Sequence, residues 1–339
     1  MTLRFKGVNI PLVLLLGLGG GFLVIRYGAW ERGALGKIPH ASRPLPQGRT
    51  CAARLAERVQ MLAGRIGERN IFKARALESA ASYIEEEFRK QGYPPRAQSY
   101  EVRWDGMLPA KARNIEAVVP ADRPGAPVLV VGAHYDTAPG TPGADDNASG
   151  VAALLELAAR LRGRARTVEL RFVAFCTEEP PFFGSEQMGS ARYAASLEKE
   201  GRRVLGMISL EMLGYYSEEP RSQTYPPLLG LFYPSRGDYL GFVSNLSSRK
   251  FLRRILAGYK PPRQTPSVGA ALPQWLSVIT LSDHLWFWRH GWPAVMATDT
   301  AFLRNPDYHE AGDTPDQLNY ERMADAVEGL EASLLDLAR

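Results

Sequence analysis

The chain has 339 residues, of which 45% are hydrophobic and 23% are charged, and its formal net charge is +5. This length and composition suit a large folded domain and exclude bulk disorder. The basic residues are scattered rather than gathered in blocks with aromatic residues, so we do not expect nucleic-acid binding. The two cysteines, Cys51 and Cys176, form no Cys-x-x-Cys pair, which excludes a zinc site made of thiolates.

The first predicted element is the uncharged apolar segment from Val8 to Ile25, which follows Arg4 and Lys6. Its length is just sufficient for a helix that crosses a membrane, so we predict an uncleaved membrane anchor. The alternative is a cleaved signal peptide, although no clear Ala-x-Ala site follows the segment. The chain therefore divides into an anchor or signal segment at 1–30, a linker at 31–50 and a folded domain at 51–339.

Helical and strand patterns alternate over the folded domain. Helices are predicted over 77–88, 148–161, 186–197, 238–257 and 320–337, and strands over 97–104, 113–119, 127–133, 168–176, 204–210 and 292–297. Residues 215–240 are rich in Pro, Gly, Tyr and Ser and predict a long excursion. The order strand–helix–strand indicates an α/β fold, with a largely parallel sheet covered by helices on both faces.

A histidine or a carboxylate follows each buried strand of this predicted sheet. In chain order these positions hold His134 and Asp136, Asp145 and Asp146, Glu178 and Glu179, Glu211, and Asp307 and His309. Ligands of open α/β sheets bind at the carboxyl ends of the strands. Each position alone has an ordinary explanation, such as a surface His-x-Asp pair, a helix cap or a solvated loop. Five such positions at one rim indicate a shared site.

Histidine and carboxylate ligands without thiolates are typical of a hydrolytic zinc site. A pair of zinc ions needs one shared carboxylate and further ligands for each ion. The set that meets this requirement is His134, Asp146, Glu179, Glu211 and His309. Glu178 is then left beside a ligand as the candidate general base. Asp136 can accept the second N–H of the His134 imidazole and fix its tautomer.

These residues also carry a resemblance to a known family. The motifs are Gly-Ala-His134-Tyr-Asp136-Thr, Gly-Ala-Asp145-Asp146-Asn-Ala-Ser-Gly, Glu178-Glu179, Ser282-Asp283-His284, and Tyr308-His309 with Asp313-Thr314. Over about residues 75–335 the chain resembles the zinc aminopeptidases, a family that includes bacterial leucyl aminopeptidases, aminopeptidase Y, glutamate carboxypeptidase II and the glutaminyl cyclases. The resemblance implies a three-layer α/β/α sandwich around a mixed sheet, with two zinc ions.

The resemblance also implies a role for each residue. His134 and Glu211 are expected at different metals, Asp146 is expected to bridge them, and Glu179 and His309 are expected to complete the two sets. Glu178 is expected to be the general base and Asp136 the partner of His134. Glu211 departs from the family, which usually has Asp there, so one zinc ion is the alternative to two.

Three functions fit this pattern. The first is an aminopeptidase acting on peptide substrates, membrane-anchored through residues 8–25, with its catalytic domain periplasmic or extracellular. The second is a single-zinc acyltransferase similar to glutaminyl cyclase. The third is a non-catalytic binding module, which the retention of Glu178 and of all five ligand positions disfavours. The sequence indicates no oligomeric state.

Overall fold

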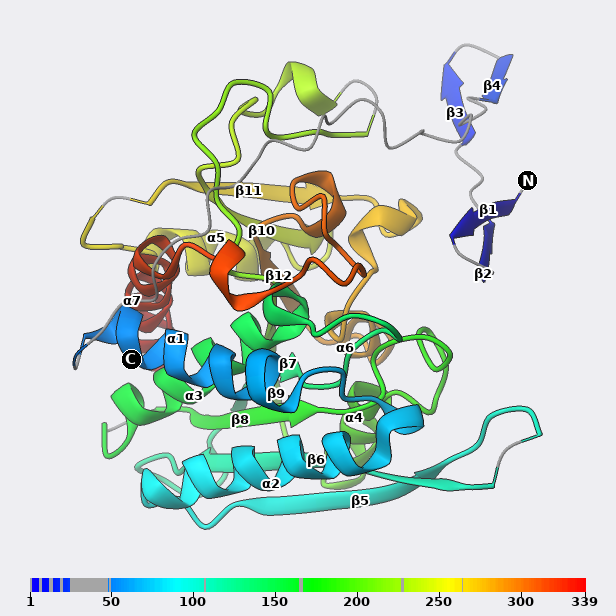
Figure 1. The fold of residues 1–339 in the computed structure, drawn as a ribbon. Helices are drawn as coiled ribbons and strands as arrows, with labels where there is room; N and C mark the ends of the chain where they lie inside the picture. The colour runs from blue at the N-terminus through cyan, green and yellow to red at the C-terminus, as the bar shows by residue number, and fades with distance from the viewer. Residues whose placement is uncertain are drawn as a thin grey trace.

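The computed structural model describes residues 2–5, 8–11, 15–18, 21–24, 48 and 50–339, apart from residues 107, 165–166, 227–228 and 264. Its main feature is an eight-stranded sheet with helices on both faces (Figure 1). The strands are β5 (Arg96–Val102), β6 (Ala110–Val119), β7 (Val128–His134), β8 (Glu169–Phe175), β9 (Val204–Glu211), β10 (Leu240–Asn245), β11 (Ser267–Leu272) and β12 (Ala294–Thr298). The main helices are α1 (Cys51–Val59), α2 (Ala74–Lys90), α3 (Gly150–Leu161), α4 (Gly189–Lys199), α5 (Arg249–Gly258), α6 (His284–Arg289) and α7 (Tyr320–Leu337).

The sheet is mixed, with the strand order β11-β10-β12-β9-β7-β8-β6-β5. Its centre is parallel, because β7 pairs in parallel with β8 and β9, and β9 pairs in parallel with β12. At one side β6 is antiparallel to β8 and to β5. At the other side β10 is antiparallel to β12 and parallel to β11. The predicted mixed sheet is therefore confirmed, and its parallel centre brings four carboxyl ends to one edge.

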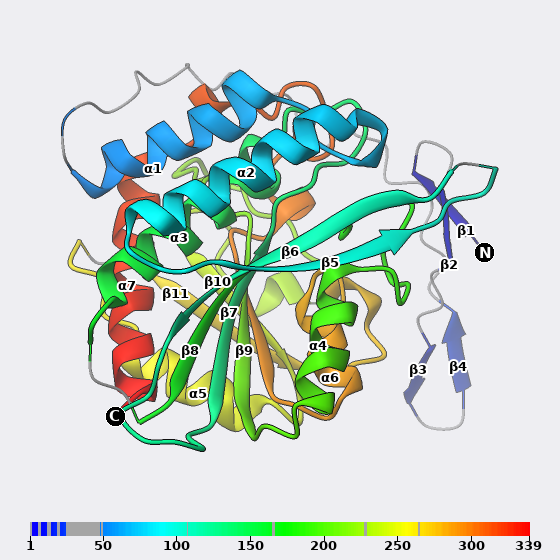
Figure 2. The same cartoon turned by 90° about the horizontal axis from the view of Figure 1, so that it is seen from below.

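The continuous apolar run of β7 is buried along its whole length. Successive side chains of a strand point to opposite faces, so such a run fills two cores. Leu129 and Val131 belong to the core packed with α1, α2, α3, α5 and α7. Val128 and Val130 belong to the core packed with α4 and α6. Figure 2 shows these two groups of helices on opposite faces of the twisted sheet.

One predicted element of the folded domain is wrong. The helix predicted over 238–257 is in fact strand β10, followed by helix α5. Leu240–Asn245 is a short apolar stretch between β11 and β12, and periodicity does not separate a short buried strand from a helix. The edge strand β11 was not predicted at all. The last helix, by contrast, has the predicted bounds.

The N-terminal segment does not form the expected helix in its described residues. These residues lie in β1 (Thr2–Phe5), β2 (Val8–Pro11), β3 (Leu15–Leu18) and β4 (Gly21–Val24), which pair as two hairpins. Residues 12–14, 19–20 and 25 of the predicted span lie outside the described part of the chain. In the described part, no helix has the length and apolar character to cross a membrane. Gly17 and Gly21 lower the helix propensity of this segment.

Candidate metal centre

The parallel centre of the sheet positions most of the predicted site. His134 is the last residue of β7 and Glu211 is the last residue of β9. Glu178 and Glu179 follow shortly after β8, between its end and α4. Asp146 lies in the irregular turn η3 (Ala144–Ser149), directly before α3.

His309 completes this group from the loop between β12 and α7. Its side chain is 28% exposed, whereas those of the other predicted residues are buried. The structure therefore brings all the predicted site residues together, and His309 is the most exposed of them.

Two histidine–carboxylate pairs meet at Asp146. His134 Nε2 lies 3.3 Å from Asp146 Oδ1 and 3.4 Å from Glu211 Oε1. His309 Nε2 lies 3.1 Å from Asp146 Oδ2 and 3.2 Å from Glu179 Oε2. Asp146 thus offers a different oxygen to each histidine, which is the arrangement of a bridging carboxylate. The expected division, with His134 and Glu211 at different metals, stays a prediction: His134 Nε2 is close to Glu211, but ligand atoms of His134, Asp146 and Glu179 also lie within 4.8 Å of one another.

The donor set fits zinc in chemistry and spacing. Zinc binds imidazole nitrogen and carboxylate oxygen at about 2.0–2.2 Å, so two tetrahedral ligand atoms are about 3.3–3.6 Å apart. The four distances around Asp146 are close to this spacing. Asp146 Oδ1 and Glu179 Oε1 are also buried without a hydrogen-bond partner among the described residues. Ligand atoms of His134, Asp146 and Glu179 lie within 4.8 Å of one another.

The electrostatics of the group favour a bound cation. Burial alone would lower the pKa of His134, but the carboxylates of Glu211 and Glu178 raise it well above its ordinary value. His309 has a raised pKa in the same way, with Glu179 as the main source. Burial raises the pKa of Glu178 well above its usual range, and the neighbouring Glu179 and Glu211 raise it further, although His134 opposes this. The site therefore holds more negative charge than the protein itself neutralises.

Asp136 contacts both His134 and the turn that carries the two glutamates. The Nδ1 atom of His134 lies 3.1 Å from the backbone oxygen of Asp136 and 3.7 Å from its carboxylate. That carboxylate accepts the backbone N–H groups of Glu178 at 3.2 Å and Glu179 at 3.1 Å. Asp136 therefore fixes the His134 tautomer through its backbone and holds the turn that carries both glutamates through its side chain.

Three further residues support the site and were not predicted to have a role in it. Asp313 accepts the backbone N–H groups of Asp145 at 2.8 Å and Asp146 at 3.0 Å. Ser282 donates its hydroxyl to Glu211 Oε2 at 2.7 Å. Arg69 is fully buried, and burial lowers its pKa to about 10. Asp313 and Ser282 stand in motifs of the resemblance, but nothing in the sequence around Arg69 marks it.

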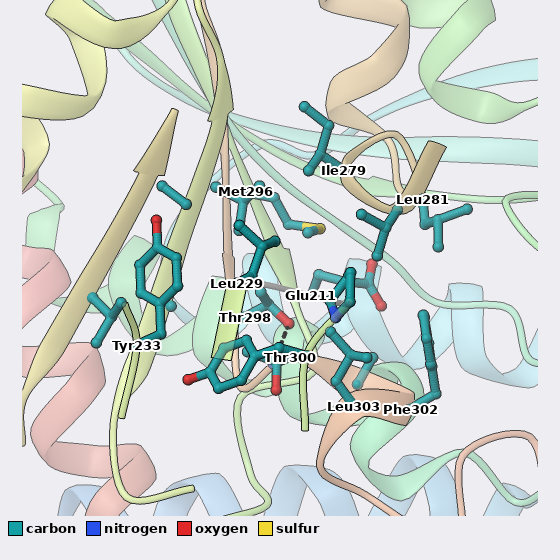
Figure 3. Close-up of a pocket in the computed structure, with 18 of the residues that line it drawn as sticks. Glu211, Leu229, Tyr233, Ile279, Leu281, Met296, Thr298, Thr300, Phe302 and Leu303 are labelled. Atoms are coloured by element: carbon teal, nitrogen blue, oxygen red, sulfur yellow. Dashed lines mark hydrogen bonds between the residues drawn. The ribbon is translucent and has the colours of Figure 1, made fainter. Parts of the chain in front are cut away.

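An apolar cavity opens beside Glu211 (Figure 3). Its volume is about 880 Å³ with its mouth included. The walls come from strands β10, β11 and β12, from the excursion near Leu229 and Tyr233, and from the segment near Phe302. Among the described residues that line it, Glu211 alone is charged. The cavity therefore suits an apolar side chain placed next to the metal centre.

Comparison with known proteins places this fold and site in a family. Peptidase family M28 matches residues 114–333, which contain every predicted site residue. A relative from Escherichia coli (strain K12), "Uncharacterized protein YfbL", is 40% identical over 318 residues, covering 91% of this chain and 92% of that protein. The chain belongs to peptidase family M28 and is a metallopeptidase.

More distant matches carry functional names of their own. "Probable leucine aminopeptidase 1" of Trichophyton verrucosum is 28% identical over 67% of this chain, and the match spans 58% of that protein. An aminopeptidase from Aneurinibacillus sp. strain AM-1 has a TM-score of 0.64 at 18% identity, covering 85% of this chain and 94% of its own. The glutaminyl cyclase of Fimbriiglobus ruber has a TM-score of 0.62 at 21% identity, covering 88% and 98%. At such identities, the solved structures show a shared fold.

Proposed function

We propose that this metallopeptidase is a zinc aminopeptidase that removes apolar N-terminal residues from peptides by means of two zinc ions. The observation that carries the proposal is the pair of histidine–carboxylate groups that share Asp146 beside an apolar cavity. His134, Asp146, Glu179, Glu211 and His309 would hold the two zinc ions. The leucine aminopeptidase named above supports an exopeptidase activity.

The zinc ligands, Glu178 and the apolar cavity each have a separate role in hydrolysis of the peptide bond. Zinc bound to these ligands would polarise the carbonyl of the scissile bond and acidify a water molecule. Glu178, buried and 3.9 Å from His134 Nε2 through its Oε2 atom, takes the proton of the attacking water and returns it to the leaving amine. The cavity next to Glu211 receives the side chain of the first residue.

The proposal is tested by measuring the activity of the zinc-loaded protein on two substrates. A leucyl anilide should be hydrolysed, and a peptide with N-terminal glutamine should not be cyclised. An acetylated leucyl anilide is the matched control, because it lacks the free amine and should be stable. Cyclisation without hydrolysis would replace the proposal with the glutaminyl cyclase reaction.

Glutaminyl cyclase remains the second candidate because of one specific observation. His134, Asp146 and Glu179 alone bring three ligand atoms within 4.8 Å, which is sufficient for a single metal ion. The glutaminyl cyclase of Fimbriiglobus ruber also shares the fold. We favour the aminopeptidase because Glu211 and His309 complete two separate groups around Asp146.

We also propose that residues 8–25 attach the protein to a membrane, with the catalytic domain on the periplasmic or extracellular side. The support is the uncharged apolar sequence of this segment. Full-length protein should remain with membranes after alkaline extraction, and a chain that starts at Arg43 should be released. Recovery of the full-length protein in the extract would contradict the attachment.

A further inference from the structure

A buried arginine from the N-terminal helices contacts the loop that connects two proposed zinc ligands. Arg69 lies between the helical turns η1 (Gln60–Ile66) and η2 (Ile71–Lys73), and its exposed fraction is 0%. Its guanidinium donates from Nε to the backbone oxygen of Tyr135 at 2.7 Å. It also donates from Nη1 to Pro142 at 2.7 Å and from Nη2 to Gly143 at 2.9 Å, again to backbone oxygens.

These bonds tie together the two ends of one loop. Tyr135 follows the proposed ligand His134, and Gly143 closely precedes the proposed ligand Asp146. The backbone of Arg69 adds two bonds near the start of this loop. Its N–H donates to Thr137 Oγ1 at 3.1 Å, and its carbonyl accepts the N–H of Thr137 at 3.0 Å. The loop between two ligands is therefore clamped by a single residue.

Burial of the charged Arg69 guanidinium has a free-energy cost. A buried charge is unfavourable unless it is compensated, and the guanidinium of Arg69 donates to backbone oxygens rather than to a carboxylate. The carboxylates that act on it from farther away include Asp313, Asp136, Asp146 and Glu179, which all belong to the site or its surroundings. Arg69 also lies outside the segment that matches the peptidase family, which begins at residue 114.

We propose that Arg69 is a positioning residue for the metal centre, where it fixes the separation of His134 and Asp146 through the loop that it clamps. The inference rests on the proposed zinc site. The positioning role of Arg69 and its positive charge predict opposite changes in zinc affinity when Arg69 is replaced. The positive charge of Arg69 repels a metal cation, so its loss alone would strengthen zinc binding. Loss of the clamp would weaken zinc binding, because the ligands are no longer held in place.

The test is the zinc affinity of the purified protein, measured by competition with a coloured chelator. Arg69→Met removes charge and clamp, Arg69→Lys keeps the charge, and Thr137→Val removes only the bond to the Arg69 N–H. We expect zinc affinity to fall by about 10- to 100-fold in both Arg69 variants and by less in Thr137→Val. Arg69→Lys and Thr137→Val keep the test decisive if Arg69→Met does not fold.

Arg58→Met is the matched control. Arg58 is another buried arginine of the N-terminal helices. It donates a hydrogen bond to Glu156 at 2.8 Å, and neither of these two residues is a proposed ligand. The Arg58→Met substitution should lower the melting temperature and leave the zinc affinity unchanged. Unchanged or higher affinity in Arg69→Lys and Thr137→Val overturns the role of Arg69. A wild-type chain that binds no zinc overturns the metal centre itself.

Discussion

Glu211 Oε1 lies 3.4 Å from His134 Nε2, at the ends of the neighbouring parallel strands β9 and β7. The resemblance to the zinc aminopeptidases implies the shorter aspartate at this position. Here the longer side chain is also held by Ser282, which donates its hydroxyl to the second carboxylate oxygen. The carboxylate of Glu211 is thereby directed toward His134, and the additional methylene does not remove it from the site.

The position of Glu211 predicts that it holds one of two zinc ions. Glu211→Ala should lower the zinc content by up to one equivalent and sharply reduce turnover. Glu211→Asp should bind the second zinc less well than wild type, because its carboxylate no longer reaches both His134 and Ser282. Elemental analysis of the three proteins side by side checks this. Equal content of one zinc ion in wild type and Glu211→Ala would remove Glu211 from the ligand set.

Glu178 is predicted to act in turnover and not in metal binding. Glu178→Gln keeps the shape of the side chain but removes the base, so turnover should fall by about 10²- to 10⁴-fold. Zinc content and melting temperature should stay close to those of wild type. Steady-state hydrolysis of a leucyl anilide measures the loss. Activity within about threefold of wild type would exclude this role.

Zinc should stabilise the protein more at high pH than at low pH. The pKa values of His134 and His309 are raised by carboxylates, although burial opposes this. A histidine whose pKa is raised by folding stabilises the metal-free fold below the unfolded pKa of about 6.5, and this contribution is lost as the pH rises through the folded pKa. Zinc requires the deprotonated imidazole, so its binding strengthens over the same range.

The measurement is the difference in melting temperature between zinc-loaded and metal-free protein. It should grow as the pH rises above about 6.5. His290→Asn is the control, because His290 is paired with Glu198 outside the site. The same trend should appear in this variant. A difference that stays constant or shrinks with rising pH would contradict the assignment of His134 and His309 as ligands.

The cavity beside Glu211 predicts the preferred side chain. Leucyl and phenylalanyl substrates should be cleaved faster than lysyl or glutamyl substrates. The described residues that line the cavity are mostly apolar, and their one carboxylate, Glu211, is a proposed zinc ligand, so a charged side chain would be buried without a partner. Ala270→Phe, on β11, fills part of the cavity and should raise KM for phenylalanyl more than for alanyl substrates. Equal changes in KM for both substrates would show that the cavity does not receive the side chain.

The sequence predicted the site better than its surroundings, for a physical reason. The carboxyl ends of parallel strands share one edge, so His134 and Glu211 could be placed together once their strands were predicted. The division of ligands between metals stays a prediction, because it depends on side-chain directions. Arg69 was missed since a single arginine in a turn carries no pattern. Strand β10 was mistaken for helix because its short apolar stretch fits both periods.

The central claim is tested most directly by the return of activity to stripped protein. The protein is freed of metal with a chelator, and release of leucine from a leucyl peptide is measured as zinc is added back. Two histidine–carboxylate groups around Asp146 predict no release without zinc and maximal release near two equivalents. Release that persists without metal, or zinc-loaded protein that releases no leucine, would contradict the account.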